Sequence, residues 1–245
     1  MTHRLGMIRS HDDNRDKLYP HPLLAMNRPT FPLVLNLQNH FSPVRDQGQA
    51  GTCALEAAAA ILEFGKPKPV VKQSVLFPYY NVRVMEGTVG EDSGAEPRDV
   101  FKSLIKDGDC ANKYWGYYLK RLSMKPSFKA YANSKIPSIT SYHAIYTADD
   151  IKMILNNILP VYIGMAVYDS FEGEDVARSG IMTMPKPEEN LQGYHAVVIG
   201  GYDDLKRWWI VRNSWGTKWG KHGYFFMPYD YMIDKYVSEK WAITV

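Results

Sequence analysis

Residues 43–65 read PVRDQGQAGTCALEAAAAILEFG, and the rest of the chain is organised around this stretch. A polar, glycine-rich approach leads into an alanine-rich segment, and alanine is the strongest helix former because it loses no side-chain entropy. We expect Thr52 to cap this helix and Gly65 to end it. The i, i+3, i+4, i+7 spacing of a buried helix face is present at Leu55, Ala58, Ala59 and Leu62.

Cys53 falls in the first turn of this predicted helix. The free backbone N–H groups and the positive end of the helix dipole favour a thiolate there, which suits a nucleophile. A lone cysteine on such a helix is more often a small core residue, because unpaired cysteines are among the most buried residue types. The functional interpretation of Cys53 therefore depends on other parts of the chain.

Two later stretches supply the partners that a thiol nucleophile needs. GYHAVVIGGY (193–202) contains His195, and WWIVRNSWGTKWGKHGY (208–224) contains Asn213. A cysteine with a distant histidine and a distant asparagine is the arrangement of a thiol acyl-transferase. The three stretches resemble the papain-like cysteine peptidases, the papain and cathepsin family, and the resemblance covers roughly residues 32–245. His195 follows Cys53 by 142 residues and Asn213 by 160, which suggests a modest insertion in the second half.

The resemblance implies a catalytic role for each matching residue. His195 would be the general base and acid, because imidazole titrates near neutral pH. A thiolate–imidazolium pair would depress the pKa of Cys53. Asn213 would hold the imidazole ring by accepting its N–H. The side-chain NH₂ of Gln47 and the backbone N–H of Cys53 would form an oxyanion hole, worth ~3 kcal/mol per donor.

The resemblance also implies where a substrate lies. The segment 93–97, with Gly94 and Ala95, resembles the backbone that pairs with an extended substrate by strand addition, although an ordinary loop before a helix is the alternative. Gly51 and Trp215 join this substrate-binding set. Trp215 resembles the indole that shields the His195–Asn213 hydrogen bond from water. We expect no metal site and no cofactor, because thiol hydrolysis needs neither and nothing in the sequence resembles a metal site.

The chain departs from the family pattern just before the nucleophile. The family's Cys-Gly-Ser-Cys-Trp reads AGTCA at 50–54. Ala50 removes a family disulfide, and Ala54 replaces a large indole at the cleft wall, but no catalytic group is lost. Cys110 is the other cysteine in the sequence, and we expect it to be a free structural thiol.

The patterns along the chain favour an α+β fold with segregated elements. Helix patterns cover 53–65, 97–106 and a capping-box segment at 147–155, and a strand is predicted at 32–37. Further strand patterns cover 161–167, 196–199, 208–211 and 224–227. The resemblance implies a papain-like two-lobe fold. A mainly helical lobe (32–125) would carry the nucleophile, an antiparallel β-barrel-like lobe (126–245) would carry histidine and asparagine, and the active-site cleft would lie between them.

Residues 1–31 are polar and punctuated by prolines, and we interpret them as an N-terminal arm. The arm is too short for the family's large inhibitory prodomain, but about thirty extended residues span up to ~100 Å and reach the cleft easily. We hypothesise that the arm, with its apolar cluster at 19–26, partly covers the cleft and is autoinhibitory. A disordered arm, or one docked elsewhere, is the alternative. The N-terminus has no apolar signal core, so we expect a cytoplasmic protein if Met1 is the native start.

Composition excludes some classes of function and leaves others open. The net charge is +3 with no run of five like charges, which argues against a nucleic-acid or membrane-surface role. We expect a cysteine-type peptidase, an endopeptidase, that acts on peptide or protein substrates through a thioester acyl-enzyme. One alternative is a catalytically weak homologue that binds peptides or partners. Another is a transpeptidase or ligase, which would use the same acyl-enzyme and the same residues.

Overall fold

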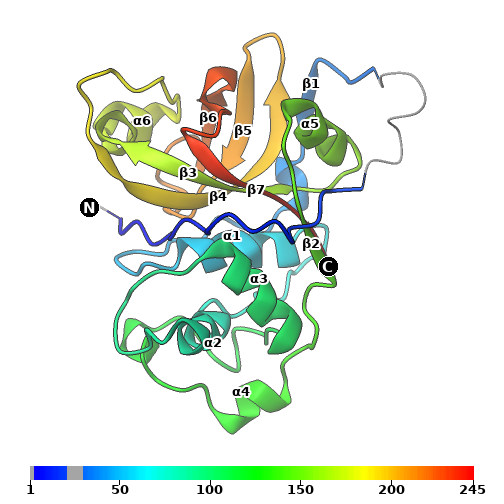
Figure 1. Ribbon diagram of the computed structural model, residues 1–245, viewed down its shortest axis with the longest axis vertical. Coiled ribbons are helices and arrows are strands. Elements are labelled where there is room, and N and C mark those ends of the chain that lie inside the picture. Colours follow the sequence, from blue (N-terminus) through cyan, green and yellow to red (C-terminus); the bar gives the residue numbers. More distant parts are fainter. Residues whose placement is uncertain (1–2, 21–29) are drawn as a thin grey trace.

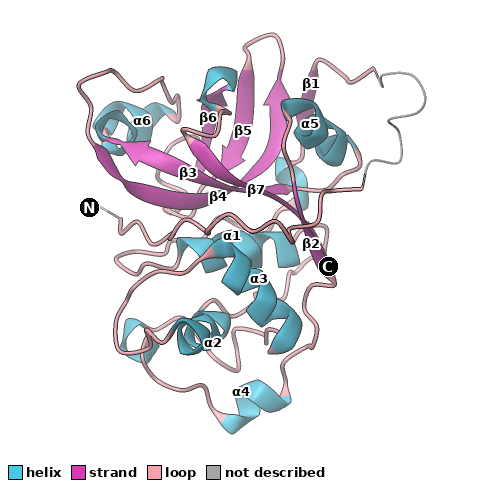
Figure 2. Ribbon diagram, in the orientation of Figure 1, coloured by secondary structure: helices cyan, strands magenta, loops and turns pink. Residues whose placement is uncertain are grey.

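The computed structural model describes residues 3–20 and 30–245 and has two lobes stacked on one another (Figures 1 and 2). Helices gather in the lower lobe and an antiparallel sheet forms the upper lobe, as the predicted α+β fold requires. No helix among the described residues is long and apolar enough to cross a membrane.

The helical lobe is built around α1 (Cys53–Leu62), and every residue of α1 is buried. It packs on one side against α2 (Leu76–Glu86) and α3 (Pro97–Lys106), and on the other against strands β3 (Val161–Tyr168) and β4 (Leu191–Asp203) of the sheet. Small alanine side chains permit this close approach on all sides. The predicted cap is wrong in detail: the Thr52 side chain does not cap the helix, and its hydroxyl hydrogen-bonds with the Tyr117 hydroxyl at 2.8 Å.

Short helix α4 (Phe128–Ala132) lies at the lower tip of the helical lobe, beyond the predicted boundary between residues 125 and 126 (Figure 1). The Tyr131 ring packs edge-on against Phe77 of α2, with ring centroids 4.9 Å apart. The chain joins the sheet after α4, at strand β2 (Ser141–Ala144).

In the described part of the chain the sheet has seven strands in the order β2-β7-β3-β4-β5-β6, with β1 paired to β4, and all these pairings are antiparallel. The predicted strands are present, although their bounds are longer or shorter than expected. Helix α5 (Ala148–Asn156) begins with the predicted capping box, while α6 (Glu174–Ser179) completes the upper lobe. The strand bounds are β1 Val34–Asn36, β3 Val161–Tyr168, β4 Leu191–Asp203, β5 Trp208–Arg212, β6 Tyr224–Pro228 and β7 Val237–Thr244.

The period of two in β4 divides the core between the lobes. Ala196 and Val198 belong to the apolar cluster around α1, whereas Val197 and Ile199 belong to the cluster inside the sheet lobe. Strand β4 therefore contributes to both halves of the molecule, and it carries His195 to their boundary.

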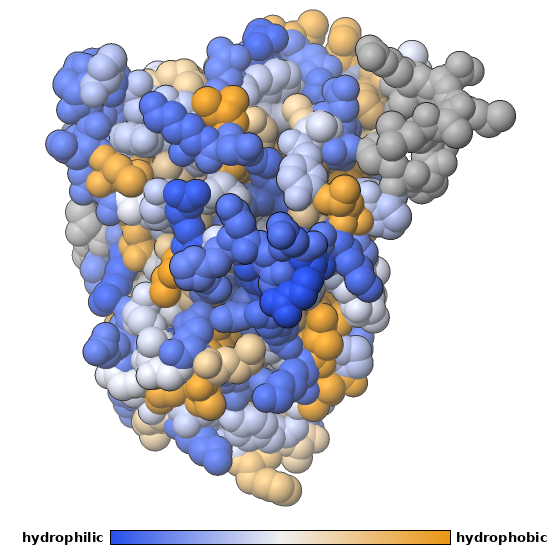
Figure 3. Space-filling model, in the orientation of Figure 1, coloured by the Kyte–Doolittle hydropathy of each residue, from blue (hydrophilic) through white to orange (hydrophobic). Residues whose placement is uncertain are grey.

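Residues 3–20 of the arm pack along that boundary instead of extending away from it (Figure 1). Met7 forms a parallel bridge with Ala95 of the helical lobe, and Leu18 forms another with Ala144 of β2. Most of the predicted apolar cluster at 19–26 lies outside the described residues. A broad band of hydrophilic side chains crosses the middle of this face, where the arm runs (Figure 3).

Candidate active site

Cys53 is the first residue of α1 and is completely buried. The backbone groups of Ala196, the arm residue Gly6 and Ala54 favour the thiolate form of Cys53. Burial nevertheless dominates and raises the pKa of the Cys53 thiol to about 11. This direction is opposite to the predicted depression, because burial removes the sulfur from water.

His195 and Asn213 come together as predicted. His195 Nε2 donates to Asn213 Oδ1 at 2.7 Å, and Ser214 donates its backbone N–H to the same oxygen at 2.8 Å. Two donors on Oδ1 fix which way the amide faces, so Nδ1 is left as the basic atom of the imidazole ring. Burial lowers the pKa of His195 to about 4, against the opposing effect of the Asn213 hydrogen bond, so the ring is neutral at pH 7.

Trp215 covers the imidazole ring. The ring centroids of Trp215 and His195 are 4.9 Å apart, and the indole is almost completely buried. The arm residue His3 stacks on Trp215 at a centroid distance of 5.0 Å and an interplanar angle of 5°. This arrangement fits the predicted shielding role of Trp215.

Gln47 is fully buried and is held at both ends of its amide. Its Oε1 accepts from Ser214 Oγ at 2.6 Å, while its Nε2 donates to the backbone carbonyls of Ala50 and Arg4, each at 2.9 Å. A carbonyl oxygen of the arm thus occupies the donor that was predicted to hold a substrate oxyanion.

The four predicted substrate contacts all face the arm: Gly51, Gly94, Ala95 and, through the His3 ring, Trp215. Ala95 donates its N–H to Gly6 O at 2.9 Å and accepts from Ile8 N at 3.1 Å, which is main-chain pairing by strand addition. A Cβ added to Gly6 would lie 2.1 Å from the carbonyl oxygen of Gly51. The arm therefore depends on glycine at position 6 to approach this closely.

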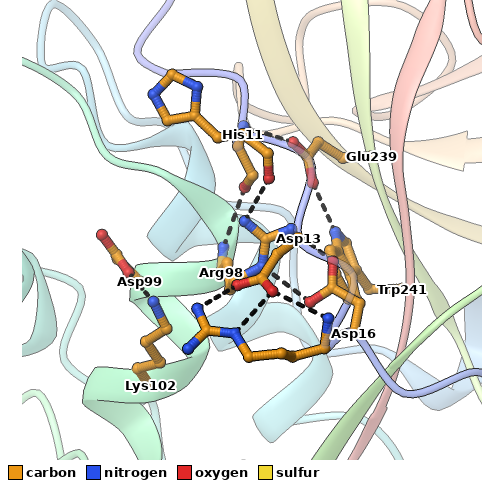
Figure 4. A network of polar contacts seen from close by, with 10 residues as sticks. His11, Asp13, Asp16, Arg98, Asp99, Lys102, Glu239 and Trp241 are labelled. Atoms are coloured by element: carbon orange, nitrogen blue, oxygen red, sulfur yellow. Dashed lines mark hydrogen bonds and ion pairs between the residues drawn. The ribbon is translucent and has the colours of Figure 1, made fainter.

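A second anchor holds the arm outside the cleft (Figure 4). Arg98 of α3 donates to both carboxylate oxygens of Asp16, at 2.9 and 2.6 Å, and to the carbonyl of His11 at 2.8 Å. Glu239 of β7 accepts the backbone N–H of Ser10 at 2.7 Å. Charged side chains of both lobes, Arg98 and Glu239, thus hold this part of the arm.

Some contributors to the site were not predicted. Ser214 links Gln47 to Asn213, and its position directly after Asn213 was the available signal. His3 and Gly6 carried no local signal, because their importance arises from where the arm lies. Within residues 3–20 and 30–245, no three His, Cys, Asp or Glu side chains gather as a metal site.

The sequence profile of the papain family of cysteine proteases matches residues 35–240, a range that includes Cys53, His195 and Asn213. The chain therefore belongs to this family and is a papain-like cysteine protease. Both lobes lie within the matched range.

Similar proteins agree with this assignment. The structure of xylellain, a cysteine protease from Xylella fastidiosa, superimposes with a TM-score of 0.90 at 34% identity, covering 98% of this chain and 96% of xylellain. An uncharacterized peptidase C1-like protein of Acanthamoeba polyphaga mimivirus is 38% identical over 212 residues, 81% of this chain and 68% of that protein. Cysteine proteinase 3 of Dictyostelium discoideum is 27% identical over 217 residues, 83% of this chain and 61% of that protein.

Proposed function

We propose that this protease is an endopeptidase that hydrolyses internal peptide bonds of extended peptides or proteins. One observation carries the proposal: a polypeptide, the arm itself, runs through the site from one side to the other. It enters at Trp215 beside His3 and leaves past Ala95 beside Ile8. A site that accepts chain on both sides of the nucleophile suits cleavage within a chain.

The chemistry follows from the residues around Cys53. His195 Nδ1 takes the thiol proton, and the thiolate attacks the carbonyl carbon of the peptide bond. The Gln47 NH₂ and the Cys53 backbone N–H stabilise the oxyanion, and the imidazolium then protonates the leaving amine. Water attacks the resulting thioester with His195 as base, so the acid product leaves and the thiol is restored. Asn213 keeps the ring in place throughout.

We further propose that the arm is autoinhibitory. Arg4 O takes the Gln47 donor, the Gly6 backbone faces the sulfur, and Cys53 has no exposed surface. The covered site also has the wrong charge state for attack. With the Cys53 pKa at about 11 and the His195 pKa at about 4, the pair is thiol and neutral imidazole at pH 7.

The endopeptidase proposal is tested with internally quenched peptides that are blocked at both ends. We expect cleavage at an internal bond, with Cys53 as the residue labelled by a peptide vinyl sulfone. Cys53→Ala should lose at least a hundredfold in kcat/KM, because loss of a nucleophile removes the covalent route. Cys110→Ser is the matched control, since that thiol is also free and buried but lies outside the site, and it should keep its activity.

Three results would contradict the proposal. One is cleavage of peptides with a free end only, which would indicate an exopeptidase. Another is tight peptide binding without turnover, as expected of a binding homologue. The third is dominant transfer to an added amine in mass spectra of the products, as expected of a ligase.

A further inference from the structure

Glu56 shares the lining of one small cavity with Asn213. It belongs to α1, three residues after Cys53, and is 4% exposed. Its Oε2 is fully buried and makes no hydrogen bond to any described residue. The Nε of Arg45 is 3.9 Å from that oxygen, too far for a hydrogen bond. A buried acceptor of this kind is costly unless something donates to it.

Asn213 has a buried N–H donor that also lacks a hydrogen-bond partner among the described residues. Its Oδ1 is occupied by His195 and Ser214, but its Nδ2 is buried and has no acceptor among the described residues. Glu56 and Asn213 line one small cavity of about 10 Å³ between α1, β4 and the end of β5. A cavity needs about this volume to hold one water molecule, which also needs polar partners. The remaining lining residues are Ala57, Ala60, Ala196, Val197, Val198, Arg212 and Ser214.

We propose that one water molecule in this cavity accepts from Asn213 Nδ2 and donates to Glu56 Oε2, which makes Glu56 a positioning residue for catalysis. The water holds the asparagine amide with Oδ1 toward His195 Nε2, and the imidazole is oriented through it. This role rests on the proposed function of the Cys53–His195–Asn213 site. Glu56 itself touches no reacting atom.

The charges around Glu56 are compatible with the bridge. Arg45 and Arg212 favour its ionised form, whereas Glu63 and Asp46 disfavour it. Burial is the largest effect and raises the pKa of Glu56 to about 7. Both the carboxylate and the carboxylic acid keep an oxygen that accepts from water. The bridge therefore needs the acceptor at position 56 and not the charge.

Glu63 provides a matched control for the alternative that Glu56 serves only the fold. It lies at the end of the same helix, is 1% exposed and forms an ion pair with the same Arg45. It also accepts the Gln73 backbone N–H, but it does not line the cavity. A purely structural role predicts similar effects from substitution at the two positions.

The first test compares Glu56→Leu, Glu56→Gln and Glu63→Leu by NMR of the full-length chain labelled with ¹⁵N-histidine. The readout is solvent exchange of the His195 Nε2 proton, which reports its hydrogen bond to Asn213 without requiring turnover. We expect exchange to accelerate at least tenfold in Glu56→Leu and to stay as in the wild type in Glu56→Gln and Glu63→Leu. Unchanged exchange in Glu56→Leu, or equal acceleration in Glu63→Leu, would overturn the proposal.

The second readout is kinetic. Glu56→Leu should lower kcat about tenfold with little change in KM, because the imidazole is misplaced while substrate contacts remain. Glu56→Gln should restore kcat, since its amide oxygen still accepts from the water. Absence of turnover even when the arm is displaced from the site would count against the proposed peptidase and would leave the NMR result standing.

A crystal structure of the wild-type protein decides the matter if Glu56→Leu does not fold. The expected result is one ordered water within about 3.2 Å of both Asn213 Nδ2 and Glu56 Oε2. A dry cavity, or a water that contacts only one of the two atoms, would overturn the proposal.

Discussion

At the residue scale, the state of Cys53 is decided by two opposing effects. The helix N-terminus and a neighbouring imidazolium would favour a thiolate, and both could be anticipated from the sequence. Burial disfavours the charged form of each partner, raising the pKa of Cys53 and lowering that of His195. In the covered site burial is the stronger effect. Exposing the sulfur to water should restore the thiolate–imidazolium pair that the sequence predicts.

Alkylation of the thiols checks this balance. In the intact chain we expect iodoacetamide to modify Cys53 slowly at pH 5–7, because a thiol with a pKa of about 11 is only about 0.01% thiolate at pH 7. Cys110, whose pKa burial raises to about 12, serves as the internal reference. Rapid labelling of Cys53 at pH 5–6, with Cys110 unmodified, would contradict a buried site in which the Cys53 thiol and the His195 imidazole are both neutral.

At the scale of elements, the arm is the segment that changes how the site is understood. It pairs with Ala95, covers Cys53 and is fastened by Arg98 and Glu239, yet no pattern in residues 3–20 marks it as a strand. Its contact with the site depends on Gly6, where the backbone passes directly over Gly51. A side chain at this position must push the arm away.

Gly6→Ala should therefore activate the enzyme without shortening the chain. Overpacking of this kind typically costs 1–3 kcal/mol, so we expect kcat/KM for a small fluorogenic peptide to rise about tenfold. Gly90→Ala is the control, because a Cβ added at Gly90 meets nothing within 4 Å. Equal constants for Gly6→Ala and the wild type, with both folded, would show that the arm does not inhibit.

At the scale of the whole molecule, a cluster of charged side chains is buried inside the fold. Arg45 pairs with Glu63 and lies near Glu56, and all three side chains are largely buried. The folded chain raises the pKa of Glu56 from 4.5 to about 7, so the fold binds a proton that the unfolded chain releases. The contribution of this Glu56 proton to the stability of the fold is complete below pH 4.5 and is lost as pH rises through 7.

Urea unfolding at pH 5 and pH 8 measures this contribution. Relative to Glu56→Gln, the wild type should lose up to about 3 kcal/mol of unfolding free energy across that interval. Glu188→Gln, at an exposed position, should leave the difference between the two pH values as in the wild type. If the wild type and Glu56→Gln depend on pH equally, Glu56 is not the titrating group.

The sequence by itself determined the family, the nucleophile helix, α3, the capping box of α5 and most strands, because these depend on local periodicity and motifs. β7 was not predicted, since Glu239 and Lys240 interrupt its apolar pattern, and neither was α2, which holds Pro78 within an aromatic run. Only the tertiary structure decided whether the catalytic residues are accessible, which charges they carry and which residues support them. The arm lies across the site, burial reverses the expected charge state of Cys53 and His195, and Glu56 comes to line one cavity with Asn213. These features join residues far apart in the chain through desolvation and close packing, which no local pattern encodes.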